Sequence, residues 1–201
     1  MKSLLLLLVF VTSSIFSAKD TISDTERKMA LKEFQRTKQR FLNDVKGLSA
    51  AQLSFKADTS RWSIAQCIEH IALAESLIWQ WEQMTIAQPA TPEKASEVKT
   101  TDEQLMKGLI DRSHKFTAPE MLQPVGKFPS TEAAIQAFTS RRDSTIAYIS
   151  STQDDLKNHF AQHPAFGTLN TYQLILMISG HSERHTLQIE EVKANPAFPK
   201  Q

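Results

Sequence analysis

The stretch NTYQLILMISGHSERHTLQIEEVKANP at residues 170–196 decides the fold of this 201-residue chain. Apolar residues return every three or four positions along it, which is the period of an amphipathic helix. Asn170 can cap this helix while Gln173 reaches back to the cap, and Asn195 and Pro196 stop it. The sequence therefore predicts a long helix whose apolar face must be buried against other helices.

Three more long segments carry the helical period, at residues 24–46, from Arg61 to just before Pro89, and from 130 to about 151. Ser63 and Gln66 have the spacing of a capping box at the start of the second segment. No strand-like alternation of useful length and no internal repeat is visible. Four amphipathic helices in one chain predict an all-α four-helix bundle.

A long connection separates the second and third of these four helices. It contains a shorter helical segment at residues 100–110, where Thr100 and Glu103 have the spacing of a capping box. Prolines and a glycine then mark an irregular crossing at residues 119–129. We therefore expect the bundle to have a long crossover connection instead of short turns throughout.

His181 and His185 lie four residues apart in the last helix, so both imidazole rings project from one face. This face is also apolar, because Met177 precedes the pair by one turn and Ile189 follows it by one turn. Two buried imidazoles side by side repel each other when protonated, whereas a metal ion binds their neutral form. Such a pair alone is weak evidence, since many pairs occur on protein surfaces by chance.

A third histidine, His70, lies in the middle of the second long helix, one turn ahead of Leu73 and Ala74. A lone histidine on an apolar face is more often a hydrogen-bonded core residue than a ligand. His70 would face the last helix, however, if the two helices pack as neighbours. We therefore predict that His70, His181 and His185 hold one divalent metal ion.

Three histidine ligands leave coordination positions open, which is typical of catalytic metal sites. Zinc and nickel are favoured as the ion, with iron and manganese as alternatives. Cys67 could add a thiolate ligand, although we interpret it as a small buried hydrophobic residue. Gln66 and Gln188 could fix the tautomers of the ligand rings, and Gln66 could equally be occupied with capping.

The sequence identifies no catalytic acid or base. Glu69 and Glu183 neighbour predicted ligands, but adjacent side chains point about 100° apart around a helix. Neither carboxylate is therefore a strong candidate for a general base at the ion.

Three short motifs occur in order along the chain. They are RWSIAQ at 61–66 followed by His70, HPAFG at 163–167, and H-x-x-x-H-x-x-Q at 181–188. Together they resemble the DinB-like (YfiT-type) family of metal-dependent hydrolases, over one domain at residues 24–196. The resemblance implies an up-down-down-up four-helix bundle with one divalent ion, held by motif position by His70, His181 and His185.

The resemblance also implies a choice of functions. The favoured one is a hydrolase in which the ion activates water on a small-molecule substrate. The alternatives are a thiol S-transferase that uses low-molecular-weight thiols, and a non-catalytic metal- or ligand-binding protein. Members of the family are often dimers, so a homodimer is also among the expectations.

Residues 1–18 have the pattern of a signal peptide. Lys2 is followed by an apolar run at 4–11 and by small residues that end at Ser17 and Ala18, near which we expect cleavage. The run is shorter than the roughly 20 residues that span a bilayer, so no membrane span is expected after removal of the leader. The alternative is a leader that is not cleaved and tethers the protein to the membrane. We expect a periplasmic or extracellular protein, which favours hydrolysis over transfer of a cytosolic thiol.

The composition narrows the choice of partners. The formal net charge is +1 and no basic run is present, so nucleic acid is not an expected partner. Apolar residues make up 41% and charged residues 22%, the balance of a folded chain. A single cysteine leaves no internal disulfide, so the helical core must supply the stability.

Overall fold

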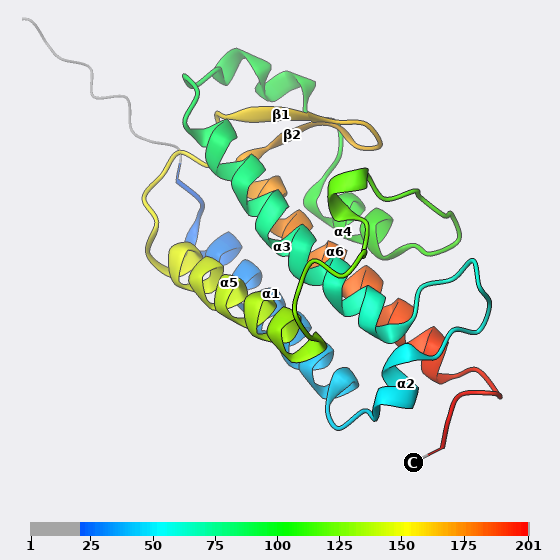
Figure 1. Ribbon diagram of the computed structural model, residues 1–201. Coiled ribbons are helices and arrows are strands. Elements are labelled where there is room, and N and C mark those ends of the chain that lie inside the picture. Colours follow the sequence, from blue (N-terminus) through cyan, green and yellow to red (C-terminus); the bar gives the residue numbers. More distant parts are fainter. Residues whose placement is uncertain (1–20, 201) are drawn as a thin grey trace, which may run out of the picture.

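A computed structural model describes residues 21–200 of the protein, and the predicted signal peptide at 1–18 lies outside these residues. Figure 1 shows the elements and their order. The helices are α1 (Asp24–Val45), α2 (Ala50–Ser54), α3 (Ile64–Ile86), α4 (Asp102–Ile110), α5 (Thr131–Ser151) and α6 (Thr171–Lys193), with short 3-10 helices η1 (Pro92–Glu97) and η2 (Glu120–Leu122) and strands β1 (Phe160–His163) and β2 (Gly167–Asn170).

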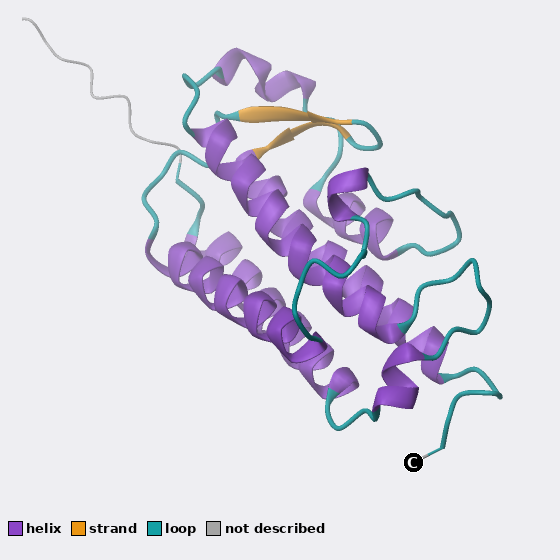
Figure 2. Ribbon diagram, in the orientation of Figure 1, coloured by secondary structure: helices purple, strands orange, loops and turns teal. Residues whose placement is uncertain are grey.

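The four long helices α1, α3, α5 and α6 form the predicted four-helix bundle (Figures 1 and 2). Helices α1 and α6 run in one direction while α3 and α5 run in the other, which gives the up-down-down-up order. Because α3 and α5 are parallel, the long segment between them must return along the outside of the bundle. Helix α4 lies in this segment and packs against α6.

The capping boxes predicted for α3 and α6 are present, but the one predicted for α4 was placed one residue too early. Thr101 and Gln104 form the box, in place of Thr100 and Glu103. The hydroxyl group of Thr100 donates instead to the backbone oxygen of Phe166, at 3.0 Å. Thr100 is thus engaged with the distant hairpin, and the adjacent Thr101 caps the helix.

A small antiparallel hairpin precedes α6, where the sequence showed no strand-like alternation. Strands β1 and β2 pair from Phe160 with Asn170 to His163 with Gly167, and Gly167 adopts a positive φ of 73°. Each strand has four residues, which is too short for an alternating pattern to be distinguished from a loop.

The centre of the bundle contains one fully buried cation, the guanidinium group of Arg142 in α5. It donates to both carboxylate oxygens of Glu75 in α3, at 2.5 and 2.8 Å. It also donates to Thr37 and to the backbone oxygen of Phe34 in α1, at 2.6 and 3.2 Å, and to Ser182 in α6, at 2.7 Å. One side chain thus connects all four long helices.

Helix α4 approaches α6 closely at Gly180, the residue before His181. A methyl group at this position would lie 2.7 Å from Cδ1 of Leu109, so a larger residue would push α4 outward. The absence of a side chain at Gly180 therefore lets α4 pack directly beside the predicted ligand. Between residues 21 and 200, no helix is long and apolar enough to cross a membrane.

The carboxyl group of Glu82 in α3 is buried, and this burial makes the stability of the fold depend on pH. Oε2 accepts from Gln83 at 2.7 Å, but Oε1 is buried without a partner in the described part of the chain. Burial, with a smaller repulsion from Asp154, raises the pKa of Glu82 to about 7 from its ordinary 4.5. The folded protein therefore holds a proton that the unfolded chain releases between these two pH values.

Below about pH 4.5 Glu82 is protonated in both the folded and the unfolded chain, so its burial costs no ionisation energy. The free energy of unfolding then falls as the pH rises to about 7. We expect Glu82→Gln to raise the free energy of unfolding at pH 8 by about 1–3 kcal/mol, because no charge must be buried. The gain should shrink as the pH falls to 4.5. Urea unfolding of both proteins from pH 4.5 to 8 measures it, and a difference independent of pH would contradict this explanation.

Candidate metal centre

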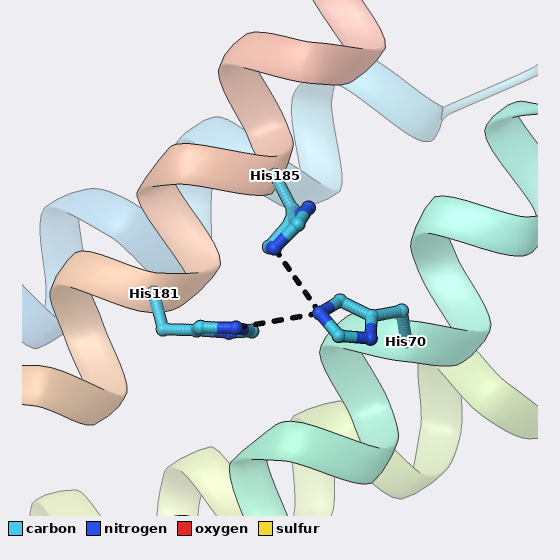
Figure 3. A group of neighbouring side chains, drawn as sticks. All are labelled: His70, His181 and His185. Carbon is cyan, nitrogen blue, oxygen red and sulfur yellow. Dashed lines mark hydrogen bonds between the residues drawn. The ribbon is translucent and has the colours of Figure 1, made fainter. Parts of the chain in front are cut away.

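His70 from α3 and His181 and His185 from α6 point toward one another in the described structure (Figure 3). Nε2 of His70 lies 3.3 Å from Nε2 of His181 and 3.1 Å from Nε2 of His185. The two α6 residues are one helical turn apart, and His70 lies opposite them because α3 and α6 pack as neighbours. The structure therefore brings all three predicted ligands together.

The Nδ1 atoms of two of these rings bind to fixed acceptors. Nδ1 of His70 donates to the backbone oxygen of Leu122, at 2.8 Å, and Nδ1 of His185 donates to Oε1 of Gln188, at 2.9 Å. Carbonyl oxygens only accept hydrogen bonds, so both Nδ1 atoms carry the proton of a neutral ring. The Nε2 atoms are then left with free lone pairs that face the centre of the cluster.

The environment favours the neutral form of all three rings. His70 and His185 are buried and His181 is partly buried. Loss of hydration is the main cause that lowers the pKa of each histidine, and neighbouring histidines lower the pKa of His181 and His185 further. The pKa of His181 falls to about 3, with Arg184 as an additional cause. Neutral imidazole is the form that binds metal ions.

The spacing of the Nε2 atoms fits a single transition-metal ion. Nitrogen ligands lie about 2.0–2.1 Å from tetrahedral zinc, which places them about 3.3–3.4 Å from one another. The observed distances of 3.1 and 3.3 Å are close to this value. In residues 21–200 these histidines are the one set of three such side chains that the structure brings close enough to share an ion.

Gln188 and Gln66, the predicted hydrogen-bond partners of the ligand rings, make different contacts. Oε1 of Gln188 holds His185 and also accepts from Nη1 of Arg112, at 3.4 Å. Gln66 forms the capping box of α3, where its Oε1 accepts from the backbone nitrogen of Ser63 at 3.1 Å. Of the two glutamines, Gln188 is therefore the one that bonds to a histidine of the cluster.

Cys67 does not join the cluster. It is fully buried among apolar side chains such as Phe41 and Ile64. Burial raises the pKa of its thiol to about 12, so the thiolate needed for metal binding is disfavoured at neutral pH. Its environment is that of a small hydrophobic residue.

Trp62 has a role that the sequence interpretation missed. Its ring centroid lies 4.7 Å from that of His70 and 6.0 Å from that of His185. The indole ring thus covers two of the three imidazoles. It also lines, with Arg61, Gln188 and other residues of α6, a pocket of about 310 Å³. The three histidines do not line this pocket, but Trp62 and Gln188, which contact them, do.

The two glutamates next to ligands in the sequence are both occupied elsewhere. The carboxylate of Glu69 accepts from the backbone nitrogens of Gly126 and Lys127. That of Glu183 accepts from Arg36 and Arg40 of α1 through Oε1, while its Oε2 is buried without a hydrogen-bond partner in the described part of the chain. Neither is directed at the cluster, which agrees with their positions around the two helices.

The chain matches known proteins in sequence and in fold. The sequence profile of the DinB superfamily matches residues 33–189. The uncharacterized protein YuaE of Bacillus subtilis (strain 168) is 29% identical over 153 residues, which cover 75% of this chain and 89% of YuaE.

The fold is similar to that of YfiT from Bacillus subtilis, described as a probable metal-dependent hydrolase with an unusual four-helix bundle topology. The TM-score is 0.59 at 13% identity, over 87% of this chain and 89% of YfiT. At this identity the likeness establishes the fold alone. The profile match, by contrast, extends over most of the chain and includes all three histidines. The resemblance seen in the motifs is therefore confirmed, and the chain belongs to the DinB superfamily.

Proposed function

We propose that this protein is a metal-dependent hydrolase that acts on a small-molecule substrate. The observation that carries the proposal is the convergence of three neutral Nε2 atoms, from His70, His181 and His185, at the spacing of ligands of one ion. The description of YfiT as a probable metal-dependent hydrolase supports it. Zinc or nickel is the preferred ion, because imidazole nitrogen suits both.

A divalent ion in such a site acts as a Lewis acid and lowers the pKa of water bound to it. The protein's own contribution is to hold and orient the ligands. The Leu122 carbonyl and Gln188 keep the protons of His70 and His185 on Nδ1. Trp62 covers two of the rings and limits the access of bulk water from its side.

A non-catalytic metal- or ligand-binding protein is the second candidate function. It is favoured by the contacts of Glu69 and Glu183, since each carboxylate is already engaged with backbone nitrogens or arginines. Hydrolysis would then depend on water activation by the ion without a carboxylate base nearby. Thiol S-transfer remains a third candidate, and it is distinguished by its need for a thiol acceptor.

The hydrolase proposal predicts activity that depends on both the metal and His181. Protein loaded with zinc or nickel should hydrolyse at least one substrate in panels of esters and amides. Removal of the ion with a chelator, or His181→Ala, should lower the rate by about 100-fold or more, since the Lewis acid is lost. His114→Ala is the matched control, because this imidazole is exposed and lies outside the cluster.

Parallel reactions with thiol acceptors separate the three candidates. Turnover that requires a thiol would replace hydrolysis by S-transfer. Stoichiometric metal binding without turnover in any panel would favour the non-catalytic candidate.

We also propose that the protein is exported, on the basis of Lys2 and the apolar run at 4–11. The mature chain should then begin after Ser17 or Ala18 and be recovered outside the cytoplasm. Fractionation of expressing cells, with sequencing of the amino terminus of the product, tests this prediction. An intact Met1 on cytosolic protein would contradict it.

A further inference from the structure

One ligand of the proposed metal centre is oriented by a segment with little regular structure. We call residues 119–127 the strap; it contains the short helix η2 and lies between α4 and α5. The backbone oxygen of Leu122 in the strap accepts from Nδ1 of His70, at 2.8 Å. Both the tautomer and the ring orientation of His70 therefore depend on where the strap lies.

The strap is attached to α3 at a second point, through Glu69. This buried carboxylate accepts from the backbone nitrogen of Gly126, at 2.9 and 3.1 Å to its two oxygens, and from that of Lys127, at 2.7 Å. Bonds from N–H groups to an ionised carboxylate are shorter and stronger than bonds between neutral groups. Glu69, which directly precedes His70, thus holds the end of the strap against α3.

Other side-chain bonds of the strap stay within the crossing segment. Nε2 of Gln123 donates to the backbone oxygen of Ala118, at 2.5 Å, and Nζ of Lys127 donates to that of Met121, at 2.7 Å. These bonds shape the segment but do not attach it to the bundle. Besides the bond from His70 to Leu122, the carboxylate of Glu69 and the packing of the buried Leu122 side chain supply that attachment.

We propose that Glu69 is a positioning residue of the metal centre. By fixing Gly126 and Lys127, Glu69 places the Leu122 carbonyl so that His70 presents Nε2 to the ion. The inference rests on the proposed metal centre, and it assigns to Glu69 no contact with the ion or the substrate. The carboxylate acts on the ligand through the backbone of the strap.

The first test compares Glu69→Gln with Glu82→Gln. Both substitutions remove a buried carboxylate from α3, but Glu82 lies twelve residues after His70, about 18 Å along the helix. We expect Glu69→Gln to weaken zinc binding by about 10–100-fold, the usual effect of losing a group that orients a ligand. Zinc affinity of Glu82→Gln should equal that of the wild type. Competition with a chromogenic chelator measures both.

A second pair of variants, one in the strap and one a control outside it, tests the same attachment without changing α3. Gly126 has a positive φ of 85° and Gly47 one of 71°, and a methyl group at either position meets no atom within 4 Å. Alanine at either position therefore adds backbone strain and no collision. Gly126→Ala should weaken zinc binding in the same direction as Glu69→Gln, whereas Gly47→Ala should not. This pair decides the question if Glu69→Gln fails to fold.

The NMR signal of the His70 Nδ1 proton provides a readout that a general loss of stability would not change. In the wild type this proton is held by the Leu122 oxygen and should give a downfield resonance that exchanges slowly. In Glu69→Gln and Gly126→Ala the resonance should move upfield or broaden by exchange. It should be unchanged in the two controls.

Unchanged zinc affinity together with an unchanged resonance in Glu69→Gln and Gly126→Ala would overturn the role of Glu69. The resonance can also be recorded in zinc-free protein. A wild type that binds no zinc, but shows the resonance and its loss in the variants, would instead count against the proposed metal centre and leave the attachment of the strap supported.

Discussion

The buried guanidinium group of Arg142 sets the relation among the four long helices. Its bonds reach Glu75 in α3, Thr37 and Phe34 in α1, and Ser182 in α6. A buried charge that loses its partner costs about 3–5 kcal/mol, so a helix cannot slide along its neighbours without a large loss of stability. Apolar packing alone would tolerate such a shift more easily, because hydrophobic attraction has no preferred direction.

This constraint also determines where the histidines meet. Glu75 follows His70 in α3 by little more than one turn, and Ser182 directly follows His181 in α6. The bonds from Arg142 to Glu75 and Ser182 therefore fix the position of α3 along α6, and with it the level at which His70 faces His181 and His185. Burial inside the bundle lowers the pKa of these rings and keeps them neutral. The core that stabilises the bundle therefore also keeps the histidines in the form that binds metal ions.

The predictable part of the structure is the part governed by local pattern. Apolar periodicity and caps located the long helices, and the i, i+4 spacing of His181 and His185 suggested a shared ion. The family resemblance supplied the order of the helices. Contacts between distant segments gave no such signal. The oxygen that orients His70 belongs to the backbone of Leu122, and a backbone oxygen is present in every residue, so the sequence could not indicate this contact. Arg142 is adjacent to Arg141 in a polar stretch of α5, and only the assembled bundle buries it.

Elemental analysis of protein purified without a histidine tag tests most directly whether the three histidines hold one divalent ion. The wild type and Cys67→Ala should each contain about one ion per chain, because the buried thiol is not a ligand. His70→Ala, His181→Ala and His185→Ala should each lose tight binding, since two imidazoles rarely hold an ion firmly without a third ligand. Full occupancy in His70→Ala would contradict the account, even with the bundle intact.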